Sequence, residues 1–212
     1  IIETGHPISD AQSLLAGRTL VDFIQSIPKN EKVLFLISGG TSALAEVLPD
    51  DYTLEQWQRQ NEELIASGKS IAEINQVRKS LSEIKGGKLA RKLDGRSTTA
   101  LYISDVPGDK LDVIGSGLLC PDRQDTQQNQ AYFKSIENII IANNTMACQQ
   151  AGELAEKQGY RVTWHKDILE GDINQAAGHI YQAIKSGPKG VYVWGGETTV
   201  ALPTSPGLGG RN

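Results

Sequence analysis

The sequence lacks both an apolar run that could cross a membrane and an opening segment typical of secretion. A spanning helix needs about 20 consecutive, mainly apolar residues, and no such run occurs among the 212 residues. Residues 1–7 have neither a basic leader nor an apolar core, which are the marks of a signal peptide. Because 39% of the residues are hydrophobic and 22% charged, we expect a globular, cytoplasmic protein of one large domain or slightly more.

Cysteine and histidine are scarce, and two well-known nucleotide motifs are missing. Cys120 and Cys148 show no C-x-x-C spacing, which disfavours a zinc site or a disulfide framework. His6, His165 and His179 lie far apart in the sequence, so we expect surface or hydrogen-bonded side chains and no metal triad. Neither G-x-x-x-x-G-K-S/T nor G-x-G-x-x-G occurs, which excludes a Walker-type P-loop and leaves no dinucleotide fingerprint.

Positive charge is confined to one part of an acidic chain. The net charge of −4 disfavours a nucleic-acid-binding protein, because binding a phosphate backbone needs an extended positive surface. Between residues 78 and 92, however, six basic residues stand against a single acidic one. A local basic patch of this kind favours a small anionic ligand over a long polyanion.

Strand and helix patterns alternate along the chain, which is typical of a parallel sheet with helices on its faces. Apolar strands are predicted at residues 32–37, 100–103, 139–142, 161–164 and 190–194. The first is apolar from Val33 to Ile37, which predicts burial on both faces. Helices are predicted to begin near Asp10, and at the capping boxes of Thr53 with Gln56 and Ser70 with Glu73. The predicted fold class is therefore α/β, with a three-layer, Rossmann-like parallel-sheet domain.

Two glycine pairs follow predicted strands, where open α/β sheets bind ligands. The first belongs to a run of small residues whose N–H groups, hydroxyls and helix N-terminus suit an anion, namely Ser38, Gly39, Gly40, Thr41 and Ser42. An ordinary tight turn is the alternative. The second pair, Gly195 and Gly196, precedes Glu197, and a further glycine-rich segment ends in Arg211 and Asn212. We consider these last three residues candidate ligand contacts.

A basic helix face and an acidic loop complete the set of candidate segments. Asn75, Arg78, Ser82 and Lys85 recur on one helix face. There Arg78 offers a planar fork for an anion, and Lys85 a mobile point charge beside a flexible glycine pair; a merely solvated face is the alternative. The loop after residues 100–103 carries Asp105, Asp109 and Ser116. Its carboxylates are suited to Mg²⁺, or Asp105 could accept the proton of a substrate hydroxyl, and a plain turn is the alternative.

These segments, in this order, resemble the class II glycerate kinases of the MOFRL family. The most specific stretches are residues 74–79 with 85–87, residues 103–109, and residues 195–200 with 209–212. The resemblance implies transfer of the ATP γ-phosphoryl group to D-glycerate, giving 2-phosphoglycerate, with Mg²⁺ and a site between two α/β domains. It also implies that residues 1–188 form most of the larger domain, and that residues 189–212 begin the smaller MOFRL domain.

The chain departs from the family pattern in ways that affect activity more than identity. It reads Gly39-Gly40-Thr41 where three glycines are common, and Leu118 where proline is frequent. The family's upstream Gly-Lys-Ala segment and everything beyond Asn212 are absent. We therefore expect a fragment with little or no turnover, and kinase activity in the full-length protein.

Together with this resemblance, the motifs imply an enzyme that binds ATP, Mg²⁺ and D-glycerate and no nucleic acid or membrane, with a homodimer as a possible assembly. A hydroxypyruvate reductase that uses NAD(P)H and a noncatalytic protein that binds small anions are the alternatives. The predicted catalytic residues are Arg78, Lys85 and Asp105; the predicted substrate or phosphate contacts are Ser38, Gly39, Gly40, Thr41, Ser42, Lys79, Ser116, Glu197, Arg211 and Asn212; and the predicted Mg²⁺ ligands are Asp105 and Asp109.

Overall fold

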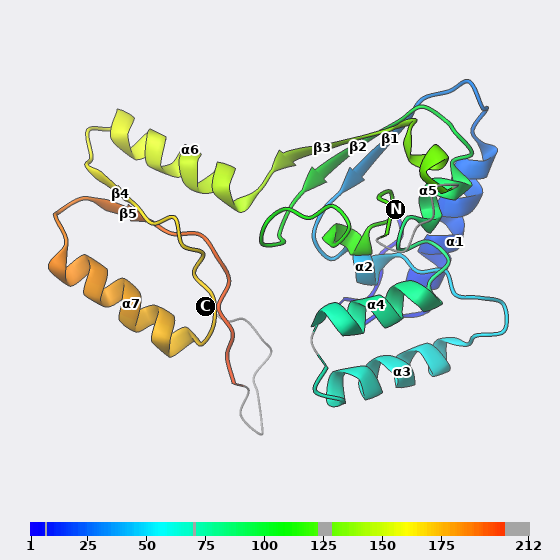
Figure 1. Cartoon of the computed structure of the whole chain (residues 1–212), viewed down its shortest axis with the longest axis horizontal. Helices are drawn as coiled ribbons and strands as arrows, with labels where there is room; N and C mark the ends of the chain where they lie inside the picture. The colour runs from blue at the N-terminus through cyan, green and yellow to red at the C-terminus, as the bar shows by residue number, and fades with distance from the viewer. Residues whose placement is uncertain (7, 70, 123–128, 202–212) are drawn as a thin grey trace. The chain divides into compact units, whose positions relative to one another are not determined.

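The chain folds into two compact units, Ile1–Ile141 and Ala142–Asn212, shown in Figure 1. The structure is a computed structural model, and it describes every residue except 7, 70, 123–128 and 202–212. Within the described residues, no helix is long and apolar enough to cross a membrane.

The first unit is built on a three-stranded sheet in the order β1-β2-β3. Its strands are β1 (Val33–Ile37), β2 (Thr98–Ile103) and β3 (Ile136–Ala142). β1 and β2 are parallel, with Val33 opposite Thr98 and Ile37 opposite Tyr102, and all three arrows run in the same direction in Figure 1. The predicted α/β class with a parallel sheet is thus confirmed.

The helices of the first unit begin largely where the sequence predicts. They are α1 (Ala11–Ser26), α2 (Thr41–Leu44), α3 (Leu54–Ala66), α4 (Ile71–Leu81) and α5 (Lys88–Lys92), with 3₁₀ turns at Ile114–Ser116 and Asn129–Phe133. Asp10 caps α1 by accepting a hydrogen bond from the backbone N–H of Ser13, and Thr53 forms a capping box with Gln56 at α3. Such caps satisfy N–H groups that the helix itself leaves unpaired. The third predicted cap, Ser70, lies outside the described residues.

The core of the first unit lies on one face of this sheet. Ile24 of α1 and Leu89 of α5 are fully buried there against Ala100 of β2. On the opposite face Leu34 is 61% exposed and Leu36 is 75% exposed. The prediction that β1 is buried on both faces is therefore wrong for the described residues, because their helices cover only the face of Val33 and Ile37.

The second unit repeats the strand and helix alternation on a smaller scale. It contains α6 (Asn144–Lys157), β4 (Val162–Trp164), α7 (Ile173–Ser186) and β5 (Val191–Val193), and β4 pairs with β5 in parallel. Asn143 caps α6 and Asp172 caps α7. The domain boundary predicted between residues 188 and 189 falls inside this unit, just before β5. As a boundary between family modules, it stays a prediction.

Candidate active site

A cavity of about 730 Å³ in the first unit brings together residues from three of the four predicted segments. The glycine pair follows the carboxyl end of β1, and Asp105 follows the carboxyl end of β2. Adjacent parallel strands place both loops at one edge of the sheet, where ligands of open α/β sheets bind. The predicted site residues that line the cavity are Gly39, Gly40, Ser42, Arg78, Lys85, Asp105 and Ser116.

The glycine pair allows two close approaches at the cavity wall. A Cβ atom on Gly39 would lie 2.3 Å from the Asp105 Oδ2, so only glycine leaves room for this carboxylate. Gly40 has a φ of 81° and caps α2, a left-handed conformation that glycine adopts without strain. Because α2 has only four residues, the helix-dipole contribution expected here is small.

Hydroxyl groups connect the first loop to the third. The Oγ atoms of Ser42 and Ser116 are 2.8 Å apart and hydrogen-bonded. The Thr41 hydroxyl instead donates to the backbone carbonyl of Ser38 at 2.5 Å. Ser42 and Ser116 therefore lie at the cavity, whereas Thr41 stabilises the turn and, with Ser38, does not line the cavity.

Arg78 is held at the cavity by a partner that the sequence analysis did not identify. Its Nε donates to the Oδ1 of Asn61 at 2.6 Å, and the Nδ2 of Asn61 donates to the backbone carbonyl of Trp57 at 2.8 Å. Burial lowers the pKa of the Arg78 guanidinium, and the negative charge of Glu46 opposes that effect. Since arginine stays charged in proteins, Arg78 presents a fixed cation to the cavity.

Lys85 is not the mobile point charge that the sequence predicts. Its side chain is 1% exposed and forms an ion pair with the fully buried Glu46, and its Nζ lies 5.4 Å from the centre of the Trp57 ring. The reason is that α4 ends at Leu81, so the chain turns inward before Lys85. The predicted helix face thus contributes Asn75, Arg78 and Lys85 to the cavity.

The other predicted site residues that the structure describes are not part of the lining of this cavity. The Lys79 ammonium group donates a hydrogen bond to the backbone carbonyl of Asp112 at 2.8 Å and lies 3.5 Å from the Asp122 carboxylate. Its positive charge is therefore paired within the first unit. Asp109 lies in a turn with a φ of 52° and does not line the cavity. Glu197 belongs to the second unit, and Arg211 and Asn212 lie outside the described residues.

Of the two predicted Mg²⁺ ligands, Asp105 lines this cavity. The described part of the chain contains no group of three or more His, Cys, Asp or Glu side chains that could hold a metal ion. Mg²⁺ commonly takes only one or two protein carboxylates, with water and substrate phosphate supplying the remaining oxygens. Asp105 fits that pattern, and the role of Asp109 stays a prediction.

Several cavity residues carry no signal in the sequence. His6 lies against Gly40, where its Cδ2 would be 3.3 Å from an added Cβ. Trp57 and Asn61 come from α3, a helix that the motifs did not implicate. Only the three-dimensional packing places these side chains beside the glycine pair and the basic residues.

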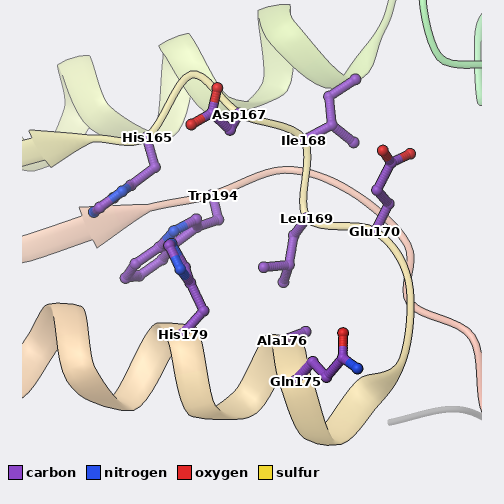
Figure 2. Close-up of a pocket in the computed structure, with 9 residues that line it drawn as sticks. All are labelled: His165, Asp167, Ile168, Leu169, Glu170, Gln175, Ala176, His179 and Trp194. Atoms are coloured by element: carbon purple, nitrogen blue, oxygen red, sulfur yellow. The ribbon is translucent and has the colours of Figure 1, made fainter.

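A second cavity, of about 330 Å³, lies in the second unit between the β4–α7 loop, α7 and the end of β5, as Figure 2 shows. The His165 and Trp194 rings are stacked with centres 4.2 Å apart, and the His179 ring meets His165 edge-on at 6.3 Å. His165 and His179, which lie far apart in the sequence, thus meet in the folded chain. None of the described residues that line this cavity is a lysine or an arginine, so this lining suits an anion less well than that of the first cavity.

The fold and the first cavity together define the class: an α/β protein with a parallel sheet and, at the carboxyl ends of its strands, a cavity lined by Arg78, Lys85 and Asp105. Comparison with known families makes this more specific. Residues 1–147 match the model of the family described as "Domain of unknown function (DUF4147)", and the chain belongs to that family.

The named relatives carry two enzyme names, glycerate kinase and putative hydroxypyruvate reductase. The chain is 32% identical to a D-glycerate 2-kinase of Thermotoga maritima, in an alignment that covers 100% of the chain and 58% of the relative. It is also 32% identical to a putative hydroxypyruvate reductase of Agrobacterium vitis, covering 100% of the chain and 64% of that protein. The crystal structure of a Thermotoga maritima glycerate kinase matches 99% of the chain and 58% of its own length, with a TM-score of 0.81 and 31% identity.

Proposed function

We propose that the full-length protein phosphorylates D-glycerate with ATP and forms 2-phosphoglycerate. The observation that carries this proposal is the cavity in which Arg78, Lys85 and Asp105 meet at the ends of parallel strands. The similarity to relatives named as glycerate kinases supports the same reaction. Because the chain spans 58% of the Thermotoga relative, the activity is proposed for the whole protein.

The chemistry required by this reaction matches the groups at the cavity. The hydroxyl oxygen of glycerate forms a bond to the γ-phosphorus, the bond from that phosphorus to ADP breaks, and the hydroxyl proton is released. In phosphoryl transfer, positioning and electrostatic stabilisation supply most of the catalysis. Arg78 would bind a carboxylate or phosphate in the bidentate manner its fork allows, and Lys85 would offset the charge of the transferring group.

Asp105 has two compatible roles in this scheme. Its carboxylate could accept the hydroxyl proton as the attack proceeds, or it could hold a Mg²⁺ ion that is also bound by ATP oxygens. When bound, that ion would neutralise phosphate charge. Gly39 contributes by leaving room for the carboxylate, and Ser42 with Ser116 places hydroxyls at the same wall.

The remaining predicted features belong to the same proposal. The use of ATP is consistent with a cytoplasmic enzyme. A homodimer as the oligomeric state of the protein stays a prediction. We also propose that residues 189–212 begin a MOFRL module in the full-length protein. Glu197, Arg211 and Asn212 would then contribute to substrate binding from that module.

One assay on the full-length protein tests the proposal against its alternatives. Incubation with ATP, Mg²⁺ and D-glycerate, followed by ³¹P NMR, should show ADP and 2-phosphoglycerate. A 3-phosphoglycerate signal would correct the position of transfer. Binding of glycerate without ADP formation would favour a noncatalytic anion-binding protein.

A parallel assay addresses the reductase alternative, which the name of the Agrobacterium relative supports. NADH or NADPH is mixed with hydroxypyruvate and the full-length protein, and absorbance at the nicotinamide band is followed. We expect no oxidation above the rate without enzyme, because the chain carries no G-x-G-x-x-G fingerprint. Steady oxidation would instead support the reductase.

A further inference from the structure

Glu46 is a buried carboxylate that does not line the candidate active site yet contacts one of its cations. It is 0% exposed and absent from the cavity wall. Its Oε1 accepts hydrogen bonds from the Ser82 hydroxyl at 2.5 Å and from the backbone N–H of Val47 at 3.0 Å. Its Oε2 is paired with the ammonium group of Lys85. Both carboxylate oxygens are therefore engaged.

The backbone of Glu46 is also held closely against α1. Its N–H donates to the carbonyl of Ser13 at 3.0 Å. A Cβ atom on Gly17 would lie only 2.1 Å from the Glu46 carbonyl oxygen, so α1 needs glycine at this point of contact. The carboxylate thus projects from a segment with little freedom to move.

Lys85 connects this buried carboxylate to the cavity. Its ammonium group is paired with the Glu46 carboxylate and lies over the Trp57 ring, and its side chain forms part of the cavity wall. A lysine side chain is long and flexible, and it seldom keeps one conformation without partners. Here the contacts with the carboxylate and the ring define the position of the charge.

The protonation of Lys85 depends on the same carboxylate. Burial lowers the pKa of the Lys85 ammonium, and the positive charge of Arg78 lowers it further, whereas the charge and hydrogen bond of Glu46 raise it. In the part of the chain that the structure describes, the other charged or titratable groups lining this cavity are His6, Glu62 and Asp105. Of all these groups, Glu46 is the one in direct contact with the ammonium.

We infer that Glu46 is a positioning residue for the proposed reaction, which holds the Lys85 ammonium at the cavity wall, charged and beside Arg78, so that the pair receives an anionic substrate. Glu46 acts through Lys85 and does not itself touch the substrate. The inference rests on the proposed function for its catalytic consequence, but its binding consequence can be measured separately.

The test compares full-length wild type with Glu46→Gln and Glu46→Asp. Glutamine keeps the shape and the acceptor for Ser82 but removes the charge that keeps Lys85 protonated. We expect kcat/KM for D-glycerate to fall about tenfold to a hundredfold at pH 8, and its decline at alkaline pH to move to lower pH. Glu46→Asp should recover part of the activity and restore the alkaline limb toward wild type.

The matched control is Glu63→Gln, which removes the same charge from an exposed position on α3. It should leave both kcat/KM and the pH profile unchanged. If Glu46→Gln keeps wild-type kcat/KM, or loses activity equally at every pH with the alkaline limb unmoved, Glu46 is only structural and the inference is wrong.

A binding measurement separates this inference from the proposed reaction. Calorimetric titration of D-glycerate into wild type and Glu46→Gln between pH 7 and 10 requires no phosphoryl transfer. Weaker binding by the variant, with the loss growing as pH rises, supports the role of Glu46 even if wild type forms no phosphoglycerate. Equal binding by the two proteins at all pH values, or no binding by wild type, overturns it.

Discussion

Each compact unit places a pair of glycines after a parallel strand, and the two pairs serve different purposes. In the first unit Gly39 and Gly40 turn the chain from β1 into α2 and line the cavity. In the second unit the carbonyl of Gly195 accepts a hydrogen bond from the N–H of Leu169 at 2.8 Å, and Gly196 forms an isolated bridge with Leu169. That second pair extends strand pairing beyond β4 and β5.

The difference shows that the surroundings of a glycine pair, and not the pair itself, define a binding loop. Gly39 is next to the Asp105 carboxylate, and the same cavity carries Arg78 and Lys85. The cavity of the second unit has an aromatic wall and two acidic residues, Asp167 and Glu170. Among the described residues of these two cavities, fixed positive charge for a phosphate or a carboxylate is found in the first arrangement alone.

The units also differ in packing. Of the buried apolar side chains in the described residues, all but Ala176 and Val193 belong to the first unit. Close packing is what keeps a polar group at one position, because the neighbouring rotamers are then restricted. We therefore expect substitutions near the first glycine pair to change activity more than comparable substitutions in the second unit.

The largest expected effect comes from removing the guanidinium of the first cavity. Arg78→Ala in the full-length protein should lower kcat/KM for D-glycerate by about two to four decades, as is typical for loss of such a group. Steady-state kinetics with coupled detection of ADP measures it. Arg59→Ala, at an exposed position on α3, is the control and should behave as wild type. Near-normal turnover of Arg78→Ala would remove this residue from the mechanism.

A smaller effect is expected from the glycine pair itself. In Gly39→Ala the new methyl group would occupy the position of the Asp105 carboxylate and displace it, so we expect kcat to fall about tenfold to a hundredfold. The free energy of unfolding should change little, because the displaced atoms belong to an exposed side chain. Kinetics together with urea denaturation separates the two effects.

The comparison for this variant is Gly178→Ala in α7 of the second unit. An added Cβ there meets nothing within 4 Å, and alanine favours a helix over glycine by about 0.5–1 kcal/mol. It should stabilise the second unit slightly and leave kcat unchanged. Equal losses of kcat in both variants would contradict the distinction between the two units.

The smallest effect concerns the two cysteines, one in each unit. Burial raises the pKa of the Cys120 thiol to about 11, so at pH 8 it is almost entirely protonated and a poor nucleophile. Cys148 is partly exposed on α6. We expect a maleimide to label Cys148 at least about tenfold faster, as measured by mass spectrometry of peptides. Faster labelling of Cys120 would show that the first unit opens more readily than its packing indicates.

Much of the fold could be predicted because its signals are local. The apolar strands, the caps at Asp10 and Thr53, and the alternation of helix and strand all depend on residues within a few positions of one another. The segments of Gly39, Arg78 and Asp105 also carry local signals. Gly39 and Asp105 each follow a strand, and Arg78 lies on a helix with a periodic pattern. Their common cavity follows from the parallel order of β1 and β2.

What the sequence by itself determined, then, is the α/β class, its caps and the segments that carry the chemistry. The tertiary structure decided that Lys85 is buried and paired, that Glu46 is its partner, and that Asn61 holds Arg78. Glu46 and Lys85 are 39 residues apart, and no local pattern links residues at that distance. Their pairing results from packing among α1, the segment after α2 and the turn after α4, and only the folded chain brings these elements together.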